Sequence, residues 1–296
     1  MTALLHPPPA PPGPLRAAVA RRPLVAFFLL ALGVSWLVWT PYVLSANGLG
    51  LWSFRFPELL GTAQFAGVLP GALLGPLGAG LLVTALADGR PGLRRWAGRL
   101  WRWRVAPGWY ALALLGAPAL VVLAGLPFSR GVVHTPSALV LAAVVPGLLL
   151  QLVTTGLAEE PGWRDFALPR LQDRLGALGA AAVLGPVWAL WHLPLFLTEW
   201  GGWPDAPWTQ AAWFAGFCVC FNVVIAWVFN RSGQSLPVVA LLHVGVNNTA
   251  SLLWAELYPA IPADRMLPGL FATSAVAAAV VLVLTRGRLG HVRTLR

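Results

Sequence analysis

Lysine is absent from this chain, and charged residues of any kind are scarce. All 20 basic residues among the 296 are arginine, only 10 residues are acidic, and charged residues make up 10% of the sequence. A soluble domain carries about 25% charged residues, so this scarcity argues against a soluble fold. The hydrophobic content of 58% and the mean hydropathy of +0.72 argue against it as well.

Cysteine is also nearly absent, with Cys218 and Cys220 the two in the chain. They lie two residues apart in one apolar stretch, where helical geometry turns their side chains about 200° apart. This separation argues against a disulfide between them and against a shared metal ion. We interpret both as packing residues.

Long apolar stretches recur along the chain, each close to the 20 or so residues that a helix needs to cross a bilayer. Backbone polar groups in lipid must be satisfied within the segment, so these stretches are expected to be helices. We therefore predict an all-α polytopic membrane protein, a single bundle of about eight transmembrane helices within residues 24–286. The eight stretches are about 24–46, 62–87, 107–127, 137–160, 177–198, 210–230, 235–255 and 267–285.

The arginines predict the orientation of this bundle. With eight spans, 17 of the 20 fall on the side of the two termini, and an excess of basic residues is typical of the cytoplasmic side. Both termini are therefore expected in the cytoplasm, as a disordered proline-rich tail over residues 1–23 and a basic tail over residues 287–296. Because the net charge of +10 is distributed in this way, it does not indicate a nucleic-acid partner.

Tryptophan accompanies the charges at the predicted membrane surfaces. Segment 91–104 interleaves arginine with leucine and tryptophan, a pattern typical of a helix in the headgroup plane of the inner leaflet; a plain cytoplasmic connection is the alternative. Trp200, Trp203 and Trp208, near the outer ends of the fifth and sixth stretches, are interpreted as interfacial anchors.

Four ionisable side chains interrupt the apolar stretches: Glu159, Glu160, His192 and His243. A charged side chain at membrane depth is costly unless it faces an interior cavity and has partners, so such residues indicate function by default. Together with the amide of Asn247, two carboxylates and two imidazoles on three stretches predict a buried site that activates water.

Glu159 and Glu160 stand at the end of the fourth stretch. Glu160 and Arg164 lie four residues apart, in the favourable order for a helical ion pair, whereas Glu159 is rotated by about 100° and stays outside this pair. Adjacent carboxylates do not both ionise cheaply in a low dielectric, so Glu159 is suited to be a general base. Pro161 disfavours helical geometry at Glu160, and we expect a kink that aims the pair inward. A cluster of interfacial charges is the alternative.

The histidines have structural alternatives when each is taken alone. His192 follows Trp188 by four residues on an apolar helix, where a lone histidine is commonly a satisfied structural residue. His243 and Asn247 lie one turn apart on one face, and Gly245 between them lets a neighbouring helix or a substrate backbone approach. These two could equally form hydrogen bonds between helices. Taken together, the assortment favours a functional site.

As a set, these motifs resemble the CPBP family of intramembrane proteases, which includes CAAX-prenyl-endopeptidase-like and bacteriocin-processing (Abi) proteins. The resemblance covers about residues 150–255, and it implies eight spans with a catalytic core at about 137–255. In chain order the motifs are Glu159-Glu160-x-x-x-Arg164, Trp188-x-x-x-His192 and His243-x-x-x-Asn247.

The resemblance implies an intramembrane endopeptidase and a role for each catalytic residue. Glu159 and His192 would hold and deprotonate a water that attacks a peptide carbonyl. His243 and Asn247 would donate hydrogen bonds to the developing oxyanion, a contribution often worth several kcal/mol. Glu159 and His192 meet only if the first helix continues to about Leu168, and we predict that continuation.

The supporting residues include two departures from the family pattern. Glu160 with Arg164 would orient the first helix, and Trp188 stands where the family usually has phenylalanine, which keeps an aromatic wall of a different size. Asp165 stands where the family often has glycine, which puts the strength of the Glu160–Arg164 pair in question.

A metal ion is an open question. Zinc accepts ligands of this type, and Glu159, His192 and His243 would be its ligands. However, the helical HExxH spacing of metalloproteases is absent, and the resemblance implies glutamate-dependent hydrolysis that requires no metal. We therefore expect no required cofactor, with zinc as the alternative.

Two other classes of function remain open. A non-catalytic membrane scaffold or bacteriocin-immunity protein would keep the same fold, and fold alone does not decide between these. A secondary transporter would show related halves, whereas the polar residues here crowd into the second half. The expected partners are a membrane-associated peptide or protein substrate and the lipid bilayer. The arginine-rich, lysine-free composition suggests a bacterial cell membrane, with the active site open to the cytoplasm.

Overall fold

A computed structural model describes residues 13–291, and every regular element in this range is helical. An isolated bridge between Leu59 and Thr62 is the one pairing of strand type there. The predicted all-α fold is confirmed. Its physical basis is that an apolar segment surrounded by lipid must satisfy its own backbone groups, as a helix does.

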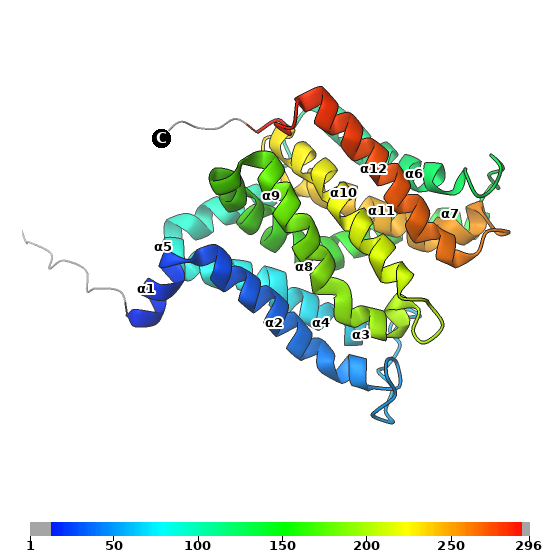
Figure 1. The fold of residues 1–296 in the computed structure, drawn as a ribbon, viewed down its shortest axis with the longest axis horizontal. Helices are drawn as coiled ribbons and strands as arrows, with labels where there is room; N and C mark the ends of the chain where they lie inside the picture. The colour runs from blue at the N-terminus through cyan, green and yellow to red at the C-terminus, as the bar shows by residue number, and fades with distance from the viewer. Residues whose placement is uncertain (1–12, 292–296) are drawn as a thin grey trace, which may run out of the picture.

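Eight helices of 14 residues or more form the body of the described chain (Figure 1). They are α2 (Pro23–Leu44), α5 (Gly78–Leu100), α6 (Pro107–Gly125), α7 (Ala138–Gln151), α9 (Leu168–His192), α10 (Thr209–Arg231), α11 (Leu236–Leu257) and α12 (Met266–Thr285). Shorter elements extend or connect them: α1 (Pro14–Arg21), α3 (Gln64–Gly67), α4 (Leu69–Ala72), η1 (Leu73–Leu77), η2 (Leu152–Gly156), α8 (Leu157–Glu160), η3 (Pro161–Ala167), η4 (Leu193–Leu197), η5 (Glu199–Gly201) and η6 (Ala263–Arg265).

Seven helical runs of the described chain are long and apolar enough to cross a membrane, against about eight predicted. The difference comes from one run of 60 residues, 138–197, that contains two of the predicted stretches. Its backbone leaves helical geometry at Gly176 (φ 73°, ψ 173°). The chain folds back there, as shown by the hydrogen bond between the indole of Trp188 in the second arm and the carboxylate of Glu159 in the first. Each arm corresponds to one predicted stretch, and the chain is a multi-pass integral membrane protein.

The first arm of this run is helical from Ala138 through Leu168, as predicted, and continues to Gly176. Pro161 does not break it: the backbone passes this residue in helical dihedrals (φ −64°, ψ −30°) and then widens into the π-helical turns of η3. Together α8 and α9 lie inside the bundle, between α2 on one side and α10 to α12 on the other (Figure 1).

The N-terminal segment corrects one prediction. A disordered tail over residues 1–23 is wrong for residues 14–21, which form α1 with proline at the first helical position. Arg16 Nε of α1 donates to the carbonyl of Leu86 in α5 at 3.1 Å. Residues 1–12, with the proline cluster, lie outside the described residues.

The predicted basic C-terminal tail begins with residues that pack on the bundle. Leu289 is fully buried, and its carbonyl accepts a hydrogen bond from Asn230 Nδ2 of α10 at 3.0 Å. The segment after α12 therefore packs on the bundle at least as far as this residue, while residues 292–296 lie outside the described range. In Figure 1, α1 and the residues that follow α12 lie at the same end of the bundle, consistent with an even number of crossings.

Segment 91–104, predicted to lie in the headgroup plane, forms the end of α5 and the connection after it. One face packs on the protein, since Trp96 Nε1 donates to the carbonyl of Pro161 at 3.1 Å. The other face exposes Arg94 and Arg95. This segment is thus tied to η3, the turn that follows the two glutamates.

Candidate active site

Two π-helical elements flank the glutamate pair. The turns of η2 precede α8 and those of η3 follow it, so that Glu159 and Glu160 stand on a four-residue helix between two widened segments. Both side chains are buried, with exposed fractions of 5% and 1%. Widened turns of this kind are frequent at functional sites. A surface cluster of interfacial charges, the alternative interpretation, is wrong because neither side chain is at a surface.

Trp188 lies at the centre of the predicted site. Its Nε1 donates to Glu159 Oε2 at 2.8 Å. Its ring packs edge-on against His192 and His243, with centroids 5.8 and 5.1 Å apart. The Arg164 guanidinium lies 4.4 Å from the centroid of this ring. One indole therefore contacts residues from all three motifs.

Glu160 connects the first motif to the third. Its Oε1 accepts a hydrogen bond from His243 Nδ1 at 2.8 Å, and its Oε2 lies 3.5 Å from Arg164 Nε. The ion pair to Arg164 matches the predicted spacing, whereas the contact with His243 was not predicted. Arg164 is fully buried.

His192 is held by one hydrogen bond and a set of aromatic rings. Its Nδ1 lies 2.8 Å from the carbonyl oxygen of Trp188, and because a carbonyl only accepts, Nδ1 carries the proton of this bond. In the neutral ring Nε2 is then the acceptor. The rings of Trp191, Trp200 and Phe214 pack around the imidazole at centroid distances of 4.6, 5.5 and 4.9 Å.

These aromatic neighbours were missed by the sequence interpretation. Trp200, interpreted as an interfacial anchor, instead stacks on His192 with an interplanar angle of 20°. Trp191 Nε1 donates to Ser35 Oγ at 2.7 Å, which ties the end of α9 to α2. The frequency of tryptophan, 16 residues in the chain, was a signal of this packing, but it did not say which rings meet.

The third motif brings two polar groups together on α11. Asn247 Nδ2 lies 3.4 Å from His243 Nε2. Gly245 between them allows a neighbouring helix to approach, as predicted: a Cβ on this residue would lie 2.9 Å from the Cβ of Ala117 in α6. The close approach is therefore made by a helix of the same chain.

Asp165, the departure from the family pattern, does not compete for Arg164. Its buried carboxylate forms an ion pair and a hydrogen bond with Arg99 of α5, whose Nη1 also donates to the Asp165 carbonyl at 3.1 Å. The Glu160–Arg164 pair is kept alongside it. Asp165 thus fastens the end of α5 to η3.

The donor set was tested for a metal site. Within residues 13–291, no group of three histidine, cysteine, aspartate or glutamate side chains is arranged to hold a metal ion. His243 Nδ1 and one oxygen of Glu159 are already engaged by Glu160 and Trp188. The three residues suggested as zinc ligands do not form a ligand set in this geometry.

The chain is similar to known proteins over its second half. Residues 141–249 match the family described as type II CAAX prenyl endopeptidase, Rce1-like. CAAX prenyl protease 2 of Methanococcus maripaludis is 28% identical over 142 residues, which are 47% of this chain and 49% of that protein. The chain thus spans about half the length of this curated relative. All the predicted site residues lie inside the matched segment, and the family resemblance drawn from the motifs is confirmed.

Proposed function

Because residues 141–249 match the Rce1-like CAAX prenyl endopeptidase family, we propose that this multi-pass membrane protein is an endopeptidase. In this proposal it hydrolyses a peptide bond of a membrane-associated peptide or protein with a water activated by Glu159 and His192. The observation that carries the proposal is the contact of one buried indole, that of Trp188, with both of these residues and with His243.

Water activation is assigned to Glu159 and His192, which both contact the indole of Trp188. The indole N–H binds one oxygen of Glu159, which leaves the other carboxylate oxygen to take a proton from water. His192 uses Nδ1 to bind a carbonyl, which leaves the lone pair of Nε2 to accept the second water hydrogen. A general base held in this way contributes about 10²–10⁴-fold to the rate.

His243 and Asn247 are assigned to the oxyanion. Their nitrogens Nε2 and Nδ2 lie 3.4 Å apart, so one substrate oxygen can bind both. Because Nδ1 already carries the proton of the hydrogen bond to Glu160, donation by Nε2 requires the imidazolium form of His243. With Arg164, this imidazolium balances the two negative charges of Glu159 and Glu160.

In this proposal the peptide bond is hydrolysed in two steps. In the first, the water oxygen bonds to the carbonyl carbon, its proton passes to Glu159, and the carbonyl electron pair moves to the oxygen bound by His243 and Asn247. In the second, the carbonyl re-forms, the carbon–nitrogen bond breaks, and the leaving amine takes the proton from Glu159. Glu160 and Arg164 react with nothing and keep α8 and α11 together.

The substrate is proposed from the bilayer setting. A site enclosed by membrane-spanning helices would act on a peptide anchored in or against the membrane, and the name of the Methanococcus maripaludis relative makes a prenylated cysteine tail one member of that class. The cytoplasmic opening of the site belongs to the same proposal, since the arginine-rich end of the bundle marks the cytoplasmic side.

Single substitutions of the purified protein in lipid nanodiscs test this function. Membrane-anchored peptides with and without a prenylated cysteine are offered, and new N-termini are identified by mass spectrometry. Glu159→Gln and His192→Ala are each expected to lower kcat by at least about 100-fold, because each removes a group from the water. Asn247→Ala is expected to lower kcat by about 100-fold through the oxyanion.

Matched controls are available in the outer loops. Glu58→Gln and His134→Ala change the same residue types at exposed positions and are expected to cleave like the wild-type protein. Cleavage is also measured with a metal chelator present: the proposed reaction is expected to be unaffected, whereas a metal-dependent reaction would be inhibited. If Glu159→Gln and His192→Ala both cleave at the wild-type rate, these two residues do not activate the water. If the wild-type protein cleaves none of the peptides, the chain is a binding scaffold rather than a protease.

A further inference from the structure

The end of α9 is the part of the site that is least supported by its own helix. His192 is the last residue of α9, and η4 and η5 follow it at once. A ring held by one hydrogen bond can pivot about that bond, so its second nitrogen is aimed only if something restrains the ring face. Trp191 and Phe214 contact the ring at steep angles, and Trp200 of η5 is the neighbour that stacks on its face, at 5.5 Å.

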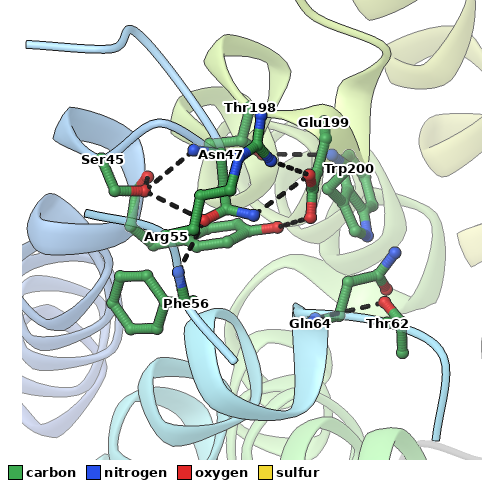
Figure 2. A network of polar contacts seen from close by, with 10 residues as sticks. Ser45, Asn47, Arg55, Phe56, Thr62, Gln64, Thr198, Glu199 and Trp200 are labelled. Carbon is green, nitrogen blue, oxygen red and sulfur yellow. Dashed lines mark hydrogen bonds and ion pairs between the residues drawn. The ribbon is translucent and has the colours of Figure 1, made fainter. Parts of the chain in front are cut away.

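Trp200 is in turn held by a polar network on the neighbouring residue (Figure 2). Glu199 accepts hydrogen bonds from Tyr42 Oη and Asn47 Nδ2, each at 3.1 Å. The backbone N–H of Glu199 donates to the Asn47 carbonyl at 2.8 Å. Figure 2 shows the Glu199 carboxylate facing Asn47, with Trp200 beside it.

This network is anchored on buried groups of the N-terminal part. Tyr42 is fully buried and Asn47 is 5% exposed. Asn47 Oδ1 accepts from the N–H of Phe56 at 2.8 Å, which fixes the amide so that Nδ2 faces Glu199. By contrast, Arg55 lies 3.9 Å from the same carboxylate and is largely exposed, so its ion pair contributes little.

We propose that Glu199, bound by Tyr42 and Asn47, is a positioning residue that holds Trp200 against His192. The stacked indole in turn fixes the orientation of the imidazole, so that Nε2 faces the water. Tyr42 and Asn47 lie outside the segment that matches the family, and so a part of the chain that the match does not cover completes the site. The catalytic consequence rests on the proposed function, whereas the positioning of His192 does not.

Chemical modification of the imidazole tests the positioning without any substrate. The intact protein in nanodiscs is treated with diethyl pyrocarbonate, which reacts with an unprotonated ring nitrogen, and modification of His192 is followed by mass spectrometry. Exposed His134 in the same molecule is the internal reference. Glu199→Ala is expected to raise the relative rate at His192 by at least about threefold, because two hydrogen bonds that hold η5 are lost.

Two further variants are expected to raise the rate of His192 modification by less than Glu199→Ala does. Tyr42→Phe removes one hydroxyl and leaves the ring, so a smaller rise is expected. Glu199→Gln keeps an acceptor for Tyr42 but offers an amide nitrogen to Asn47, so its rate is expected between those of Glu199→Ala and the wild-type protein. Glu58→Ala, an exposed glutamate of the loop after α2, is the matched control and is expected to change nothing.

The same variants are then assayed for peptide cleavage. Glu199→Ala is expected to lower kcat by roughly fivefold with KM changed by less than about twofold, since the residue aims a catalytic ring and does not bind substrate. Unchanged modification of His192 in both Glu199→Ala and Tyr42→Phe overturns the positioning role. If His192 is modified faster in these variants but the wild-type protein cleaves none of the peptides, the positioning role stands and the protease function is rejected.

Discussion

The indole nitrogen of Trp188 gives this residue a function that a phenylalanine in its place does not have. Both rings supply an aromatic wall, but only tryptophan donates a hydrogen bond, and here the acceptor is the buried carboxylate of Glu159. A carboxylate out of water needs donors, and each hydrogen bond to a charged group contributes about 1.5–3 kcal/mol. Trp188 is thus expected to fix which oxygen of Glu159 faces the water.

Trp188→Phe tests this role at the residue scale. The protein is expected to fold and to keep both histidines in contact with the ring, while kcat for peptide cleavage falls by about tenfold because Glu159 loses its donor. Steady-state kinetics on the most rapidly cleaved peptide measures the change. Trp213→Phe, at a 40% exposed position of α10, is the control and is expected to be silent. A Trp188→Phe protein with full activity would show that the hydrogen bond is dispensable.

The π-helical element η3, which follows the glutamates, depends on contacts between backbones. η3 crosses η1 so closely that a Cβ on Gly162 would lie 2.3 Å from the carbonyl oxygen of Pro76. A Cβ on Gly80 of α5 would lie 3.3 Å from Gly162 Cα. Small residues permit this approach in membrane proteins, where apolar burial alone provides little attraction between helices. The crossing holds Glu160 and Arg164 within the bundle.

Gly162→Ala tests the crossing at the element scale. The added methyl has no room, since its neighbour is backbone, and overpacking of this kind costs about 1–3 kcal/mol. The midpoint of thermal unfolding in detergent is expected to fall, and kcat to fall with it because η3 shifts. Gly98→Ala in α5 is the control: its Cβ meets nothing within 4 Å, so the midpoint is expected to stay or rise. Equal midpoints for the two variants would contradict the close crossing.

At the scale of the whole molecule, polar networks connect the loops at each of the two ends of the bundle. At one end, Arg102 of the connection after α5 donates to the carbonyl of Gly233, and Arg170 of α9 pairs with Asp88 of α5. At the other, the Glu199 network joins the loop after α2 to the loop after α9. The arginine-rich end carries both described chain ends, and on the positive-inside bias we propose that it is the cytoplasmic one.

This orientation is tested by labelling single cysteines in intact cells. Each is introduced into a chain in which the two native cysteines are replaced by alanine, and a membrane-impermeant maleimide is added. Arg55→Cys and Arg130→Cys are expected to react in intact cells, whereas Arg94→Cys and Arg288→Cys react only after lysis; all four positions are exposed. Reaction of Arg94→Cys in intact cells would reverse the orientation.

Several features of the protein follow from the sequence alone. The helical class follows because lipid requires every backbone group to be satisfied locally, so that apolar length by itself predicts a spanning helix. The candidate site residues follow because a charged or imidazole side chain within such a stretch is costly without a partner. The Glu160–Arg164 pair follows from one turn of helix. Each of these depends on residues close together in the chain.

Only the tertiary structure decided which groups meet. The contacts of Glu159 with Trp188, of Glu160 with His243 and of Tyr42 with Glu199 join residues 29, 83 and 157 positions apart. Hydropathy and helical spacing specify which face of a helix is polar, but the partner of that face depends on how helices cross and where the chain folds back, as it does at Gly176. Side-chain packing between distant helices sets those crossings, and no local pattern encodes it.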